Sequence, residues 1–266
     1  YLANDSFADL WVIPVADAGG GVAAVWTLTV TGPATEDGTL NVYIGQRRVQ
    51  VAVTSGDAQN AIAAAIEAAL DADVDNLPMT ASVAANVVTL TAKNKGTAQQ
   101  DVTVQLNFLG LEGGEETPAG VAVAVANTVT GITDPALTNA IAAMGDEVYD
   151  FIVLGFNDAT ARGLVLDELE RRWGATVQVY GHAFVAAGGS TGALEALAYD
   201  SRFLTVFGFE TNNPTPAYEW CASHTGQSAA SLRIDPARPL HTLRVRQVTH
   251  APIASRFTLE ERNSLL

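Results

Sequence analysis

The stretch "YDFIVLGFNDATARGLVLDELERRWG", residues 149–174, decides the fold of the second half of the chain. Its opening residues, 149–156, are too continuously apolar for a half-exposed strand, and they predict a strand covered on both faces. Asp158 then caps a helix that is expected to run to Trp173, where Gly174 follows. A buried strand that leads directly into a helix is typical of a parallel sheet with helices on its faces.

The same alternation of strand and helix continues along the chain to about residue 232. The expected elements are a strand at 176–184, a helix at 190–200, a strand at 202–209 and a helix at 216–232. Upstream, Asp134 and Pro135 have the residue types of a helix cap and a first helical position. The sheet then lacks a first strand, and "LWVIPVAD" at 10–17 is expected to supply it.

Residues 24–130 follow a different pattern. Short runs alternate apolar and polar positions, are rich in Val and Thr, and are separated by Gly, Asn and Asp. This pattern predicts an antiparallel sheet with one face in water, including a hairpin turn at 84–86. One helix interrupts the strands at 57–72, with Asp57 as its expected N-cap and an apolar stripe formed by Ile62, Ile66 and Leu70.

These two patterns predict an α/β domain with a parallel-type sheet and flanking helices, interrupted by an inserted β-rich module made of an antiparallel sheet plus one helix. We place the discontinuous α/β domain at 1–20 and 131–266, with a C-terminal arm segment at about 233–266, and the module at 21–130. The Gly-rich connections at 18–21 and 130–135 suit the base of an inserted domain.

Composition excludes several classes of function. The 266 residues carry a formal net charge of −15, and only 16% of them are charged. Nucleic acid is therefore not expected as a partner, because phosphate contacts need clustered Lys and Arg. Cys221 is the single cysteine, which excludes an internal disulfide and a cysteine-based zinc site. No apolar run is long enough to span a membrane, so we expect no membrane partner.

Two candidate ligand sites also have simpler, structural explanations. The Gly-rich turn at 186–197 lies between a strand and a helix, but it lacks the Lys of a P-loop and the spacing of G-x-G-x-x-G, so it reads as an ordinary loop. Asp17, Asp158 and Glu210 follow three of the proposed strands and could together hold a cation such as Mg²⁺. The simpler reading is that Asp158 caps a helix and Asp17 precedes a linker.

No residue set indicates catalysis. Cys221 and His224 lie three positions apart on a predicted helix, but no orienting acid or oxyanion donor accompanies them. They are better explained, with Trp220, as one packed helix face, and His182 as a core histidine. We therefore predict no catalytic, metal-binding or cofactor-binding residue, no cofactor, and no enzyme activity.

The C-terminal stretch "IDPARPLHTLRVRQVTHAPIASRF", 234–257, is the most unusual part of the chain. Prolines and arginines give it an extended, cationic character in an acidic protein; residues 232–266 carry a net charge of +3. It either lies over its own domain or reaches a neighbouring acidic subunit, where strand addition would give it affinity. The candidate contact residues are Arg238, Arg244, Arg246, Arg256 and Arg262. Beyond them, Thr258 and Glu261 predict the capping box of a last helix.

The segments that carry a family resemblance lie mainly in this region. "IDPARPLHTLRV" (234–245) and "APIASRFTLEERNSLL" (251–266) resemble the contractile tail sheath proteins of Mu-like bacteriophages. Residues 137–174 and 181–197 resemble the α/β domain of the same family, and 87–97 resembles its inserted module. The resemblance spans nearly the whole chain.

The resemblance implies a structural subunit that stacks in hexameric rings around a tail tube and contracts to drive the tube through the host envelope. Its partners would be further copies of itself, the tail tube protein, the baseplate and the tail terminator. The implied location is the virion tail, with assembly in the host bacterial cytoplasm. The family's N-terminal arm and C-terminal domain are not among these residues, so the resemblance implies a fragment that is monomeric or associates weakly.

Two other readings stay open. One is a different virion or surface structural part, such as an adhesin. The other is a metal-dependent α/β enzyme built around Asp17, Asp158 and Glu210.

Overall fold

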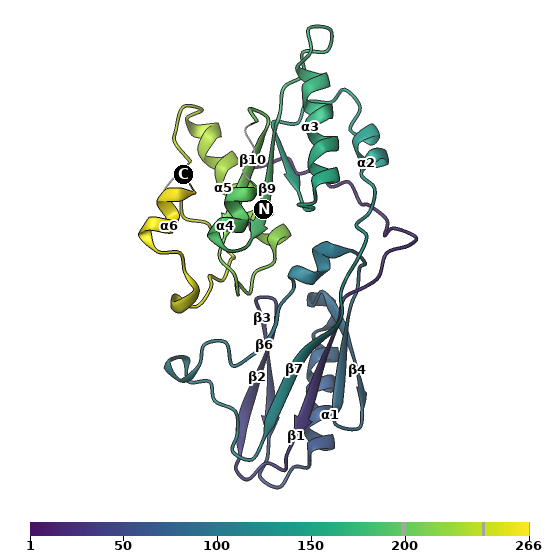
Figure 1. Ribbon diagram of the computed structural model, residues 1–266, viewed down its shortest axis with the longest axis vertical. Coiled ribbons are helices and arrows are strands. Elements are labelled where there is room, and N and C mark those ends of the chain that lie inside the picture. The colour runs from purple at the N-terminus through teal and green to yellow at the C-terminus, as the bar shows by residue number, and fades with distance from the viewer. Residues whose placement is uncertain (198–200, 241–242, 266) are drawn as a thin grey trace. The chain divides into compact units, whose positions relative to one another are not determined.

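A computed structural model describes residues 1–197, 201–240 and 243–265 (Figure 1). The chain divides into two compact units. The core unit consists of Tyr1–Ala16 and Pro135–Leu266, and the inserted unit consists of Asp17–Asp134. No helix in the described residues is both long enough and apolar enough to cross a membrane.

The core unit is built on a parallel sheet of strand order β10-β9-β8. The strands are β8 (Phe151–Leu154), β9 (His182–Gly188) and β10 (Leu204–Phe209). The helices are α2 (Thr138–Ala143), α3 (Ala159–Trp173), α4 (Thr191–Ala196), α5 (Ala217–Ile234) and α6 (Leu259–Ser264).

The central strand β9 is covered on both faces. Ala183 and Val185 belong to an apolar cluster with side chains of α3, whereas Phe184 and Ala186 belong to a second cluster with Trp220 of α5. Alternate side chains of a strand point to opposite faces, so α3 and α5 lie on opposite sides of the sheet (Figure 1). This burial on both faces explains why the sequence of the strand is continuously apolar.

The inserted unit contains two antiparallel sheets, of strand order β4-β5-β1-β7 and β3-β2-β6, in place of the single sheet expected. The strands are β1 (Val25–Thr31), β2 (Gly38–Ile44), β3 (Arg47–Val53), β4 (Met79–Ala84), β5 (Val87–Ala92), β6 (Val104–Leu106) and β7 (Ala122–Val129). Helix α1 (Gln59–Ala72) contacts strands of both sheets. Its stripe of Ile62, Ile66 and Leu70 is buried, as predicted.

The two chain crossings at the base of the inserted unit lie side by side. Val22 and Ile132 form an antiparallel bridge, with backbone N–H to O distances of 3.1 and 3.2 Å. Gly131 lies so close to the carbonyl of Gly96 that a Cβ atom would clash with it. The predicted hairpin turn is also present, since Ala85 adopts φ of 53° between β4 and β5.

Three local predictions were wrong. Residues 10–17 form no strand and pair with no sheet, and Pro14 lacks the N–H that a ladder needs. Asp57 does not cap α1, because its carboxylate accepts a bond from the Thr54 N–H in the preceding turn. Asp134 does not open a helix, because its carboxylate instead accepts bonds from the Thr97 hydroxyl and the Ala98 N–H.

Three of the expected elements, one strand and two helices, have different bounds in the structure. The strand expected at 176–184 begins only at His182, because residues 174–178 form a turn closed by bonds to the Gly174 carbonyl. Part of the helix expected at 190–200 falls on residues 198–200, which lie outside the described residues. The last helix of the α/β series extends to Ile234.

Candidate subunit-contact surfaces

The cationic segment comprises residues 235–257, and its described residues, 235–240 and 243–257, belong to the core unit. Leu240, Val245 and Val248 pack against the apolar cluster of Phe184, Phe209 and Trp220. The candidate contact residues all have exposed side chains: Arg238, Arg244, Arg246, Arg256 and Arg262. None of them forms an ion pair with a carboxylate among the described residues. Three apolar side chains of the segment thus pack inward, whereas its arginines are exposed and have no carboxylate partner among the described residues. One of them, Arg256, donates to the Ala251 carbonyl at 3.0 Å.

Side chains, rather than a neighbouring strand, hydrogen-bond to the backbone of this segment. The Asn4 side chain accepts a bond from the Arg246 N–H at 2.8 Å and donates to the Arg246 carbonyl at 3.1 Å. The Thr215 hydroxyl likewise accepts from the Thr249 N–H at 2.8 Å and donates to the Thr249 carbonyl at 3.0 Å. The structure thus shows the segment in contact with its own domain, and its contact with a neighbour stays a prediction.

The first residues of the chain are held against α5. Asp5, which is 2% exposed, accepts two bonds from the Arg233 guanidinium at 2.7 and 2.8 Å. The hydrogen bonds from Arg233 lower the pKa of Asp5. Gly226 allows the close approach, because a Cβ there would lie 2.7 Å from the Tyr1 carbonyl oxygen. The first residues of the chain are thus bonded to Arg233 of α5 and, through Asn4, to Arg246.

The last helix begins with the predicted capping box. The Thr258 hydroxyl accepts from the Glu261 N–H, and the Glu261 carboxylate accepts from the Thr258 N–H at 2.8 Å. These bonds to Thr258 lower the pKa of Glu261. Leu265 is partly buried, and Leu266 lies outside the described residues. Sequence reasoning located this helix start because both partners lie within one turn.

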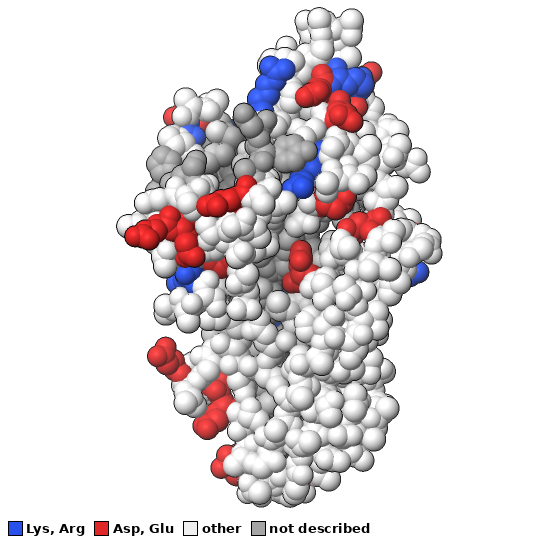
Figure 2. Space-filling view, viewed as in Figure 1, with Lys and Arg blue, Asp and Glu red and all other residues white. Residues whose placement is uncertain are grey.

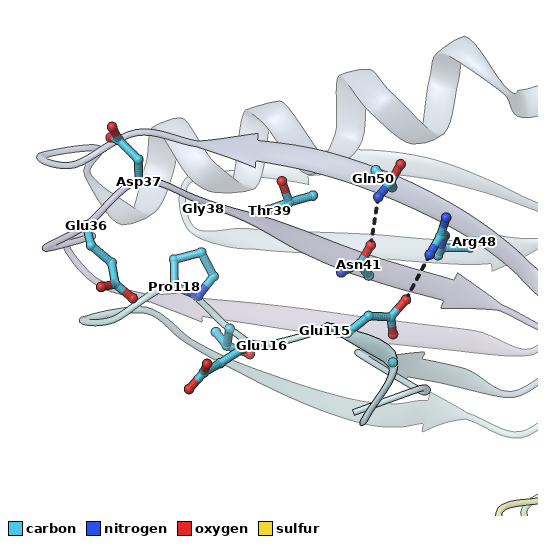
Figure 3. Close-up of a pocket in the computed structure, with 13 residues that line it drawn as sticks. Glu36, Asp37, Gly38, Thr39, Asn41, Arg48, Gln50, Glu115, Glu116 and Pro118 are labelled. Atoms are coloured by element: carbon cyan, nitrogen blue, oxygen red, sulfur yellow. Dashed lines mark hydrogen bonds and ion pairs between the residues drawn. The ribbon is translucent and has the colours of Figure 1, made fainter. Parts of the chain in front are cut away.

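A polar groove of about 530 Å³ lies in the inserted unit, between β2, β3 and the loop before β7 (Figure 3). Asn41 and Gln50 bond to each other at 3.2 Å on the strand face, and the Asn41 amide also donates to Asn107. Carboxylates of Glu36, Asp37, Glu115 and Glu116 line the groove together with Arg48. Sequence reasoning missed this groove, because its residues come from distant parts of the chain.

The buried carboxylate of Glu115 fastens the loop to the sheet. It accepts hydrogen bonds from the Tyr43 hydroxyl at 2.5 Å and from the Leu109 N–H at 3.0 Å, and it forms an ion pair with Arg48 at 3.2 Å. Burial, followed by the bond to Glu115, raises the pKa of Tyr43 to about 12. These contacts satisfy the hydrogen-bonding capacity of the carboxylate within the protein, so the network has a structural role: it holds the loop against the sheet.

The positions considered for chemistry have structural roles. Asp158 caps α3 by accepting from the Ala161 N–H at 2.9 Å, and Ser190 in the Gly-rich turn caps α4. Burial raises the pKa of the Cys221 thiol to about 12, which opposes formation of a nucleophilic thiolate. His182 bonds to the Thr205 hydroxyl at 2.8 Å. Within the described residues, no group of three or more His, Cys, Asp and Glu side chains could hold a metal ion.

The surface is sparsely charged. In Figure 2 the Lys, Arg, Asp and Glu side chains form small separated groups on a face that is otherwise uncharged. Exposed large apolar side chains concentrate in residues 2–13, which include Phe7, Trp11 and Val12 at 88%, 71% and 77% exposed. Contact surfaces are therefore more apparent in this protein than reactive pockets.

Comparison with known proteins agrees with a protein that acts through contact surfaces. Residues 130–266 match the family described as "Phage tail sheath protein central domain". The Mu-like prophage FluMu tail sheath protein of Haemophilus influenzae is 33% identical over 267 residues, which cover 100% of this chain and 54% of that protein. The chain thus spans about half the length of the curated relative it matches.

A solved structure, the D2-D3 domains of the flagellar cap protein FliD from Escherichia coli, is similar at 18% identity over 41% of this chain and 69% of that chain. Its TM-score is 0.20, so it carries no weight here.

The sequence matches place the chain among the structural proteins of bacteriophage tails. Within that class, the chain belongs to the phage tail sheath family, and the resemblance to Mu-like sheath proteins is confirmed.

Proposed function

We propose that these residues form the central part of a contractile sheath subunit. In the complete protein, copies stack as hexameric rings around the tail tube and shorten to drive the tube through the host envelope. The observation that carries this proposal is the match of the whole chain to a tail sheath protein. Within the fold, the supporting feature is a set of exposed arginines: four lie in the cationic segment, and Arg262 follows in α6.

The proposed function needs no catalysis. The Cys221 thiol is buried, Asp158 caps a helix, and Glu115 is satisfied by Tyr43 and Arg48. An assembly subunit depends on its shape and its contact surfaces, and contraction is a switch between two packings of rigid domains. We propose that the energy of contraction is distributed over many such contacts rather than stored in one site.

The partners and location follow from this role and belong to the proposal. They are other copies of the subunit, the tail tube protein, the baseplate and the tail terminator, with assembly in the host cytoplasm before incorporation into the tail. The exposed arginines Arg238, Arg244, Arg246, Arg256 and Arg262 are the proposed contacts to neighbouring subunits.

Assembly of the full-length protein tests the proposed function directly. Full-length protein produced alone is expected to form long tubes in negative-stain electron micrographs, because sheath subunits carry their own contact surfaces. Replacing Arg244 and Arg246 by Glu is expected to shorten or abolish the tubes, since both side chains are exposed and unpaired with carboxylates in the described structure. Monomeric or amorphous wild-type protein across several salt conditions would argue against a sheath subunit.

The 266-residue chain itself is expected to be monomeric or weakly associated. Its cationic segment is occupied by contacts to its own Asn4 and Thr215, so it is not extended toward a neighbour. Light scattering coupled to size-exclusion chromatography measures this. A stable hexamer at low protein concentration would show that the 266 residues alone contain the ring contacts, and would contradict the expectation.

A further inference from the structure

An exposed aromatic cluster lies where α3 ends, at the amino-terminal edge of the parallel sheet. Trp173 and Tyr180 are 47% and 54% exposed, and their ring centroids are 4.7 Å apart. The Arg202 guanidinium carbon lies 5.1 Å from the centre of the Trp173 ring and 4.7 Å from that of Phe203. We call Trp173, Tyr180 and Arg202 the aromatic–arginine patch.

The patch is held in a defined geometry. Phe203 is 5% exposed and belongs to the apolar cluster of the core unit, so it anchors one side of Arg202. A backbone bond restrains the aromatic residues: the Val179 N–H donates to the Arg172 carbonyl at 3.0 Å and fixes the turn that carries Tyr180. Contact with two rings restrains the guanidinium, while the residue as a whole stays exposed. Little side-chain entropy then remains to be lost when a partner binds.

The chemistry of the patch indicates its partner. Trp, Tyr and Arg are the residue types enriched among the energetically dominant positions of protein interfaces. No carboxylate in the described part of the chain pairs with Arg202, in contrast to Arg171 and Arg172 nearby, which pair with Glu168. A planar guanidinium beside aromatic rings matches a carboxylate-bearing protein segment.

The inserted unit carries such a segment. The acidic turn, residues 71–76, contains Asp71, Asp73 and Asp75 at the C-terminal end of α1. That end of a helix is already the negative end of its dipole, and the last turn of α1 has no basic residue. Lys93 contributes one positive charge by donating to the Val74 carbonyl at 2.6 Å. The turn still has a net charge of −2, with Asp71 and Asp75 exposed.

We propose that the aromatic–arginine patch of one copy binds the acidic turn of a second copy. The two surfaces differ, one on the core unit and one on the inserted unit, so the contact is heterologous and can propagate from copy to copy. Rings and helical stacks require contacts of this kind, because a contact between identical surfaces closes after two copies. The inference therefore rests on the proposed sheath function and names one of its subunit contacts.

Reversing the charges of the aromatic–arginine patch and of the acidic turn tests this contact. In sedimentation velocity of the 266-residue chain at high concentration and low salt, we expect weak association that decreases as salt is added. Arg202→Glu is expected to weaken it by roughly tenfold, and so is the pair Asp71→Lys with Asp75→Lys. The protein that carries all three substitutions is expected to recover association, because the charges then match again in the opposite sense.

Arg47→Glu is the matched control, since it makes the same change in net charge on an exposed arginine of β3 that lies outside both the patch and the set of proposed contact arginines. Equal weakening by Arg47→Glu, absence of recovery in the combined variant, or no association of the wild-type chain would overturn the inference. The full-length tube assay separates this inference from the sheath function. Tubes that form normally with Arg202→Glu would overturn the contact while leaving the sheath function intact.

Discussion

Replacing Arg172 by Ala is expected to destabilise the core unit by about 3–5 kcal/mol. Arg172 is 2% exposed and uses three donors: Nε to the Glu168 carboxylate at 2.7 Å, Nη1 to the Glu147 carbonyl at 2.7 Å, and Nη2 to the Gly145 carbonyl at 2.6 Å. Truncation leaves these acceptors without their donors in a site that water reaches poorly. The connection between α2 and β8 then loses its attachment to α3.

Arg171 supplies a matched control for this prediction. It lies beside Arg172 and also pairs with Glu168, but its side chain is 47% exposed. Arg171→Ala is therefore expected to leave the midpoint of urea unfolding, followed by circular dichroism, nearly unchanged. Arg172→Lys is expected to recover little, because one ammonium group cannot reproduce the planar fork. Equal midpoints for the Arg171 and Arg172 variants would contradict this account.

The parts of the fold that sequence predicted best are those fixed by neighbouring residues. Asp158 caps α3 and Thr258 with Glu261 forms a capping box, because each motif is complete within one helical turn. The stripe of α1 is buried because a 3.6-residue period specifies one face.

The wrong local predictions arise where a residue type or a composition fits more than one local structure. Asp57 and Asp134 have the residue type of a helix cap, but each carboxylate found backbone donors elsewhere. The apolar run at 10–17 has the composition of a buried strand, yet composition does not specify a pairing partner. At Asp57 a local turn to Thr54 replaced the helix cap, whereas at Asp134 and at residues 10–17 tertiary context decided between alternatives that were locally similar in stability.

The contacts that define the candidate surfaces were beyond sequence reasoning. Asp5 and Arg233 pair across 228 positions, and Asn4 bonds to Arg246 across 242. The candidate arginines were predicted from charge and from family resemblance, and the structure adds only that their side chains are exposed. Trp173 was predicted as a helix end, but its contacts with Tyr180 and Arg202 become apparent only from the fold.

Acidification is expected to destabilise the core unit through His224. This histidine stacks on Phe207 at a ring-centroid distance of 4.4 Å and lies edge-on to Phe184 at 5.7 Å. Its Nδ1 atom is buried without a hydrogen-bond partner in the described structure. Burial lowers the pKa of His224 from 6.5 to about 4, because the charged ring would lose its hydration among aromatic side chains.

The sign of the effect follows from proton binding. Between pH 6.5 and about 4 the unfolded chain binds a proton at His224 that the folded protein does not. The contribution of the neutral ring to stability is therefore complete above pH 6.5 and is lost as the pH falls to about 4. The loss amounts to roughly 3 kcal/mol. Hydrogen bonds from arginine lower the pKa values of Asp5 and Glu168. Protonation of these two carboxylates therefore adds to the loss of stability only at lower pH.

His224→Phe isolates this contribution, because a phenyl ring keeps the aromatic packing and cannot take up a proton. The free energy of unfolding, measured by urea denaturation at a series of pH values, is expected to fall less steeply for His224→Phe than for the wild type between pH 6.5 and 4. The difference at pH 8, where the imidazole is neutral in both folded and unfolded states, measures packing alone and serves as the internal reference. Parallel curves for the two proteins would show that His224 is hydrated in the folded state, and α5 would then be packed less closely on β9 and β10 than the ring distances indicate.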